Sequence, residues 1–237
     1  MKTIHHPAST RGHANHGWLN THHTFSFAGY HDHKRMQFGA LRVLNDDEVA
    51  AARGFGSHPH DNMEIVSIPL QGDLEHKDNM GNKTVIREGD IQVMSAGTGV
   101  VHSEKNHHSD RKVKFLQIWL FPNKRNVEPR YDQLSMDTER EHNAWHRVLT
   151  PRPTEGAVWI HQEAYFSIGR FDAGTETEYT FNQPGHGVYL FVLEGGATVG
   201  EIQLGHRDGL GITDTDRFSL TAGPKGARIL AMEVPMA

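Results

Sequence analysis

Residues 58–104 read HPHDNMEIVSIPLQGDLEHKDNMGNKTVIREGDIQVMSAGTGVVHSE, and the pattern within this stretch predicts the fold class. Short apolar runs occupy residues 65–70 and 91–94. Clusters rich in Gly, Asn and Asp separate the runs, as at residues 78–82 and 88–90. Runs of about four to eight residues bounded by such clusters are typical of β-strands joined by tight turns. The stretch therefore predicts a protein built from sheets.

The same strand rhythm extends on both sides of this stretch. It continues through FLQIWLFP at residues 115–122, which is almost wholly apolar. From residue 123 to residue 146 the chain is polar and charged, and the strand rhythm then resumes. Short strands at regular spacing predict an all-β sandwich or barrel. We expect an N-terminal barrel at residues 1–125, a linker at residues 126–150 and a C-terminal barrel at residues 151–237.

The two halves of the chain share a weak repeat. Residues 65–72 (IVSIPLQG) and 188–195 (VYLFVLEG) both run from an apolar start to a glycine. In each half an Ala-Gly pair follows further along the chain, at residues 96–97 and 222–223. Two copies of one β-barrel unit would explain the likeness. An internal duplication of this kind can replace a second subunit, and we expect a monomer.

The composition excludes several kinds of chemistry. The chain has 237 residues, a formal net charge of -5 and no cysteine. Disulfides, thiolate catalysis and cysteine zinc sites are therefore excluded. A mildly acidic chain without basic runs does not favour nucleic-acid binding. No segment has the apolar length of a membrane span or of a signal peptide, so we expect no membrane attachment and a cytoplasmic location.

Two short motifs point to a metal site. His58 and His60 are two residues apart, and so are His102 and Glu104. On a strand, residues two apart point to the same face, so each pair can reach a common point. Three imidazoles and one carboxylate suit a divalent transition metal rather than Ca²⁺ or Mg²⁺. We expect Fe(II) first, with Ni, Mn, Co, Cu or Zn as alternatives, and two coordination positions left open.

Most of the other histidines have a simpler interpretation. The chain has 19 histidines, and many crowd the first 33 residues without a shared spacing. We expect these to be surface residues or residues at the edge of the core. His76 is expected at an exposed strand position, with a supporting role beside the metal ligands as the alternative. His107 and His108 are expected in a loop.

The motif region as a whole resembles one known family. Residues 58–104 are similar to the signature region of pirin-family proteins, especially the bacterial quercetin 2,3-dioxygenase-like branch. RGHANHGWLNTHHTFSFAGY at residues 11–30 and FGALRVLNDDEV at residues 38–49 also resemble that branch. The resemblance implies an all-β bicupin, which consists of two small antiparallel β-barrels of jelly-roll type packed together. It places a metal in the first barrel only, on His58, His60, His102 and Glu104.

The spacing departs from the general cupin pattern in an informative way. That pattern has a glutamate ligand five residues after the second histidine, whereas Glu64 stands four residues after His60. A displacement of one residue turns a strand side chain to the opposite face, so Glu64 is not expected to be a ligand. Asn106 occupies the position of an asparagine in the pattern and is expected beside the ligands. In the second half, Phe181 and Gln183 align with the two histidines of the first motif.

The resemblance implies one leading function and one alternative. Proteins of this branch are regarded as flavonol dioxygenases, which would use O2 to open the flavonol and form a depside and carbon monoxide. Glu104 would act as the base that takes the flavonol hydroxyl proton. The alternative is a metal-dependent and redox-responsive binding protein that regulates a protein partner. No phosphate-binding loop or nucleophile elbow is present, so any chemistry must be built around the metal. The pocket must be apolar enough for aromatic rings, and we expect inward residues of 91–94 and 113–121 to line it.

Overall fold

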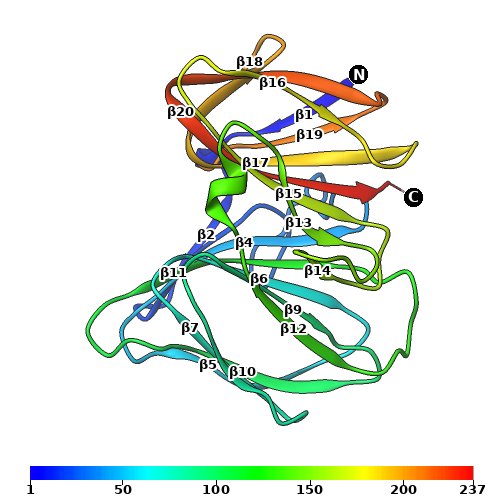
Figure 1. Cartoon of the computed structure of the whole chain (residues 1–237). Coiled ribbons are helices and arrows are strands. Elements are labelled where there is room, and N and C mark those ends of the chain that lie inside the picture. The colour runs from blue at the N-terminus through cyan, green and yellow to red at the C-terminus, as the bar shows by residue number, and fades with distance from the viewer. Residues whose placement is uncertain (237) are drawn as a thin grey trace.

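Two all-β halves are stacked on each other, as the bicupin prediction requires (Figure 1). The structure, a computed structural model, describes residues 1–236. Besides strands, this part of the chain contains two short 3-10 turns, η1 (Ala8–Thr10) and η2 (Thr138–Glu141). None of the helices in the described part is long and apolar enough to cross a lipid bilayer.

The first half consists of two sheets that enclose its interior. A seven-stranded sheet faces the second half, and a four-stranded sheet lies on the outer side (Figure 1). The larger sheet has the order β12-β9-β6-β11-β4-β3-β2, and the smaller has the order β5-β10-β7-β8. In chain order the strands are β2 (Gly12–Asn15), β3 (Leu19–His23), β4 (Leu41–Val49), β5 (Gly54–His60), β6 (Glu64–Gln71), β7 (Leu74–Asp78), β8 (Lys83–Ile86), β9 (Asp90–Ser95), β10 (Val100–Asn106), β11 (Val113–Leu120) and β12 (Arg130–Ser135).

The second half is formed by one nine-stranded sheet. Its main path is β1-β19-β17-β20-β15-β13-β14, with β16 paired to β20 and β18 paired to β17. β17 and β20 are long strands, and their mutual ladder contains two register shifts, which let one sheet fold over a core of its own. The strands are β1 (Lys2–His6), β13 (His146–Thr150), β14 (Val158–Trp159), β15 (Tyr165–Phe171), β16 (Glu176–Thr180), β17 (His186–Val199), β18 (Ile202–Leu204), β19 (Gly209–Thr213) and β20 (Arg217–Pro235).

The boundaries between the halves differ from the expected ones at two places. Residues 126–150, expected to be a linker, instead contain β12, η2 and β13. β12 pairs with β9 along its whole length, and all but one of its side chains are half-buried. An edge strand of this kind lacks alternating apolar residues, so its sequence resembles a loop. β1 was expected in the first barrel, but it pairs with β19 in the sheet of the second half.

The seven-stranded sheet is buried on both faces. Leu116, Ile118 and Leu120 of β11 point toward the second half and join a core that includes Tyr189 and Leu230. The intervening residues of β11 point into the first half. Strands covered on both faces lose the alternation of apolar and polar residues, which explains the nearly continuous apolar run in FLQIWLFP. This shared core holds the halves together, since each fully buried Leu or Ile contributes about 1.5–3 kcal/mol.

The internal repeat is visible in the backbone. Gly72 follows β6 with a φ of 73°, and Gly195 lies within β17 with a φ of 69°. At Gly195 a Cβ atom would collide with the carbonyl oxygen of Gly226, so this position needs both the left-handed conformation and the missing side chain. The two glycines that ended the repeat in the sequence therefore have the same backbone conformation.

Candidate metal centre

Three histidines meet on the outer sheet of the first half. β5 and β10 are antiparallel neighbours, with His102 opposite His58 and Val100 opposite His60. The ring centroids of His58 and His102 are 4.4 Å apart, and those of His60 and His102 are 5.0 Å apart. One ring nitrogen from each of the three histidines lies within 4.8 Å of the others. The structure thus brings the first motif and His102 of the second motif to a common point.

The histidine nitrogens are available as metal ligands. His102 is 2% exposed, and neither of its ring nitrogens has a hydrogen-bond partner. Burial lowers the pKa of His102 to about 3 and that of His60 to about 4, so both rings are neutral at neutral pH. The Nδ1–H of His58 donates to the carbonyl oxygen of Gly56 at 2.8 Å, which leaves its Nε2 lone pair free. An unpaired buried imidazole is costly, and a divalent metal is the partner that suits this cluster.

Glu104 lies on β10 beside the histidines but outside their cluster. Both of its carboxylate oxygens accept from Nε2 of Gln117, at 2.8 and 3.0 Å, and one also accepts from the Ser67 hydroxyl at 3.1 Å. Gln117 and Ser67 belong to the facing seven-stranded sheet. The carboxylate is therefore held across the interior from the opposite sheet, with lone pairs left for a metal or a proton.

A row of polar side chains crosses the inner face of the seven-stranded sheet. Cross-strand register places His23 opposite Asn45, Asn45 opposite Gln117, Gln117 opposite Ser67 and Ser67 opposite Gln92. All five are buried. Sequence reasoning missed this row. The sequence offered one signal for this row. Gln117 is the single polar residue in the otherwise apolar run FLQIWLFP, and a polar residue within a buried strand needs a polar partner.

The pocket beside the histidines has a volume of ≈ 250 Å³, and three aromatic side chains besides the histidines contribute to its wall. The indole of Trp119 packs against His60, with ring centroids 4.9 Å apart. Gln117 and Trp119 occupy inward positions of 113–121, as expected, whereas residues 91–94 do not line this pocket. Burial also raises the pKa of Asp47 in the wall to about 7. The complete lining is Phe27, Asn45, Asp47, Phe55, His58, His60, Ile65, His102, Glu104, Gln117 and Trp119.

Glu64 points away from this pocket, as the frame count predicted. Its carboxyl group accepts a hydrogen bond of 2.6 Å from the Ser95 hydroxyl, while its neighbour Ile65 lines the pocket. Glu64 is 1% exposed. Burial raises its pKa to about 7, although hydrogen bonds from Ser95 and the backbone of His161 act in the opposite direction.

This buried carboxyl predicts a pH-dependent stability. The unfolded chain releases the Glu64 proton near pH 4.5, whereas the folded protein keeps it up to about pH 7. The stability contributed by the neutral carboxyl is complete below pH 4.5 and is lost as the pH rises through 7. We expect Glu64→Gln to match the wild type near pH 4.5 and to be more stable by about 3 kcal/mol at pH 8. Urea unfolding of both metal-free proteins across this range measures the difference, and a constant offset would contradict the assignment.

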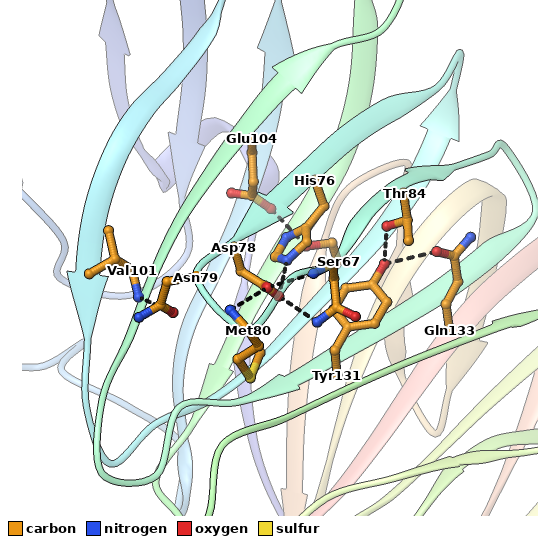
Figure 2. A network of polar contacts seen from close by, with 11 residues as sticks. Ser67, His76, Asp78, Asn79, Met80, Thr84, Val101, Glu104, Tyr131 and Gln133 are labelled. Carbon is orange, nitrogen blue, oxygen red and sulfur yellow. Dashed lines mark hydrogen bonds and ion pairs between the residues drawn. The ribbon is translucent and has the colours of Figure 1, made fainter.

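His76 is fully buried rather than exposed. Figure 2 shows it between Glu104 and Asp78, with the ring of Tyr131 beside it. Its Nε2–H donates to the Asp78 carboxylate at 2.9 Å, and its Nδ1 has no partner. The ring centroids of His76 and His102 are 5.3 Å apart. His76 therefore packs behind a candidate ligand, in the supporting position that was the alternative expectation.

The Asp78 carboxylate anchors His76 to the neighbouring turn. It accepts the backbone N–H group of Met80 at 2.9 Å (Figure 2). It also accepts the backbone N–H group of Asn82 at 3.0 Å. The Asn82 side chain donates to it at 2.8 Å. With these donors in place, Asp78 fixes the tilt of the His76 ring against His102.

Asn106 is structural and does not support the ligands. Its Nδ2 donates to the backbone carbonyls of Val49, Ala50 and Arg111, so it ties the end of β10 to two loops. His107 and His108 follow β10 in the loop where they were expected.

The structure also places the early histidines and the two second-half positions that align with the first motif. Among the early histidines, His6 and His23 are buried, at 5% and 3% exposure, so they are not surface residues. In the second half, Phe181 packs near Phe218, and Gln183 donates to the Tyr165 hydroxyl at 3.1 Å. Those two positions therefore serve packing and loop structure.

Comparisons with known proteins identify the family. A family model described as Pirin matches residues 5–120, and one described as Quercetinase C-terminal cupin domain matches residues 147–234. The chain is 40% identical over 230 residues to the quercetin 2,3-dioxygenase of Escherichia coli strain K12, covering 96% of each chain. The chain belongs to the pirin family. A further pirin-family relative, the pirin-like protein of Caulobacter vibrioides, is 36% identical over 217 residues, which cover 91% of this chain and 93% of the relative.

A solved pirin structure supports the metal assignment at the level of a divalent ion. The crystal structure of the bacterial pirin YhhW from Escherichia coli in complex with nickel(II) has a TM-score of 0.93 and 36% identity, covering 100% of both chains. Together with the cluster of His58, His60 and His102, this likeness supports a divalent-metal site in the present pirin-family chain.

Proposed function

We propose that this pirin-family protein is a metal-dependent dioxygenase that opens the ring of a flavonol with O2, forming a depside and carbon monoxide. The observation that carries the proposal is the pocket itself. It combines three convergent imidazoles with a carboxylate and with aromatic side chains. Relatives named quercetin 2,3-dioxygenase, several of them as putative enzymes, support the substrate class.

Four side chains take named roles in this proposal. His58, His60 and His102 hold the metal, with Fe(II) foremost and Ni, Mn, Co, Cu or Zn compatible with the same donors. Glu104 completes the ligand set and accepts the flavonol hydroxyl proton, because Gln117 and Ser67 are neutral donors that hold its carboxylate in place. When bound, the metal supplies two open positions and the positive charge that favours the deprotonated flavonol.

The pocket walls suit flat aromatic rings. Phe27, Phe55 and Trp119 line one cavity with the histidines. Aromatic side chains bind apolar rings and exclude water, and water exclusion strengthens the electrostatic contacts of a bound phenolate. The histidine cluster gives one part of the wall a polar character, so the site can orient a substrate whose polar edge faces the histidines.

Loss of flavonol absorbance in air tests the proposal. The full chain is stripped of metal, loaded separately with Fe(II), Mn, Co, Ni, Cu or Zn, and mixed with quercetin. We expect turnover with at least one metal and release of carbon monoxide in equal amount to the flavonol consumed.

The absence of turnover with every metal, in protein shown to contain one metal ion per site, would contradict the dioxygenase. That result would favour the alternative, in which the metal controls binding to a protein partner. Because surface histidines also bind metal ions, the occupancy is measured in parallel on His33→Ala, which removes an exposed histidine outside the pocket.

A further inference from the structure

A second chamber adjoins the metal pocket. Its volume is ≈ 460 Å³, and it lies over β3 and the loop that follows it. It shares four wall residues with the metal pocket, namely Phe27, Asn45, Asp47 and Phe55. The two cavities are therefore neighbours with a common wall, and a ligand longer than the metal pocket can extend toward this chamber.

The common wall and the chamber contain buried polar atoms without partners. They are Oδ1 of Asn45, Oδ1 of Asp47 and Nδ1 of His23. These three residues are only 3%, 5% and 3% exposed. Buried polar groups in proteins are nearly always hydrogen-bonded, so a row of three unpaired groups beside a cavity indicates a missing partner. Two of the three atoms are oxygen acceptors, which a ligand hydroxyl group would satisfy.

Phe27 is one of the four residues that form the common wall of the two cavities. Phe27 stands edge-on between His23 and Trp119, with ring centroids 5.3 Å from each. Phe27 is half-buried, and the next two residues, Ala28 and Gly29, are exposed. Because Phe27 borders a cavity on each side, an alternative rotamer of its side chain has space to occupy. Phe27 can therefore make room for a ligand that extends from one cavity into the other.

We propose that the chamber binds a hydroxylated aromatic ring of the substrate that is remote from the metal. The identification of the substrate as a flavonol rests on the proposed function. The ring would lie against Phe27 and Phe55, and its hydroxyl groups would donate to Asn45 and Asp47. His23 offers a further partner at the far side of Asn45. The enzyme would thus select polyphenols with hydroxyl groups on a second ring over compounds that carry only the metal-binding unit.

Binding of two flavonols to the nickel-loaded full chain, measured by calorimetry without oxygen, tests the inference. Quercetin has hydroxyl groups on its outer rings, whereas 3-hydroxyflavone has the same ring skeleton and the same hydroxy-ketone unit without them. We expect quercetin to bind at least about tenfold more tightly, since one satisfied buried hydrogen bond has about that effect. Equal affinities, or no binding of either compound, would overturn the inference.

Two matched variants test whether Asn45 contacts the hydroxyl groups of the remote ring. Asn45→Leu removes an acceptor of the shared wall, and we expect it to weaken quercetin binding about tenfold without changing that of 3-hydroxyflavone. Gln92→Leu removes an equally buried amide of the same polar row that lines neither cavity, and we expect it to change neither affinity. Unchanged 3-hydroxyflavone binding also shows that the variants are folded. Equal weakening of both compounds by Asn45→Leu would contradict the assignment.

The measurement separates this inference from the proposed reaction. Binding is recorded without oxygen, so it does not depend on turnover. If the protein prefers quercetin through Asn45 but never consumes it, the chamber is supported as a binding site and the proposed dioxygenase activity is contradicted. If the protein consumes quercetin but binds quercetin and 3-hydroxyflavone with equal affinity, the proposed dioxygenase activity is supported and the role of the chamber is contradicted.

Discussion

Replacement of His102 by alanine is expected to abolish specific metal binding and all metal-dependent turnover. Loss of a residue that merely supports a ligand typically lowers metal affinity 10- to 100-fold, so loss of a direct ligand should lower it by more than about 100-fold. The metal-free variant should nevertheless be as stable as the wild type, because both nitrogens of His102 are buried without partners. Metal content by mass spectrometry and thermal unfolding with and without Ni(II) check both expectations.

The size of the expected metal-dependent stabilisation follows from the metal concentration relative to its dissociation constant. A ligand present at 100 times its dissociation constant stabilises the folded state by about 2.7 kcal/mol. We expect the wild type and His33→Ala to show such a metal-dependent rise in melting temperature, and His102→Ala to show none. If His102→Ala keeps the full metal-dependent stabilisation, the metal lies elsewhere and the three-histidine site is wrong.

Replacement of Glu104 by glutamine is expected to lower kcat/KM for quercetin by about 10²–10⁴-fold, the usual effect of losing a positioned base. The amide has nearly the same shape, so the pocket should remain intact. It carries no charge, and it can no longer accept two bonds from Gln117 and one from Ser67 as a carboxylate does. Steady-state rates at saturating metal separate this loss from weaker metal binding.

A second carboxylate provides the matched control. Glu75→Gln makes the same change on β7, at a half-exposed position that lies outside the metal pocket. We expect it to leave kcat/KM within twofold of the wild type, about the scatter of a neutral surface change. Wild-type kcat/KM in Glu104→Gln, with bound metal, would exclude Glu104 both as the base and as a necessary ligand.

The sequence by itself was sufficient for the features that depend on local periodicity. A spacing of two on a strand placed His58 with His60 and His102 with Glu104. Glu64 stands one residue earlier than the glutamate of the general cupin pattern, and its side chain accordingly points toward Ser95 and away from the pocket. Such statements need no tertiary information, because successive side chains of any strand point to opposite faces. The motif region was also long enough to identify the family.

Strand order and register decided the rest. The row from His23 through Asn45 and Gln117 to Ser67 exists only because β3, β4, β11 and β6 lie side by side in one register, although β11 is distant from the others in the sequence. The hydrogen bond from Gln117 to Glu104 also requires the two sheets of the first half to face each other. Neither arrangement leaves a periodic signal in any single strand. β12 was missed for the same reason, because its place in the sheet depends on pairing with β9 rather than on apolar side chains of its own. The three histidines that cluster could therefore be predicted from the sequence, and Glu104 as a fourth ligand stays a prediction. The groups that hold Glu104 and the chamber beside the pocket were set by non-local pairing, which no single strand records.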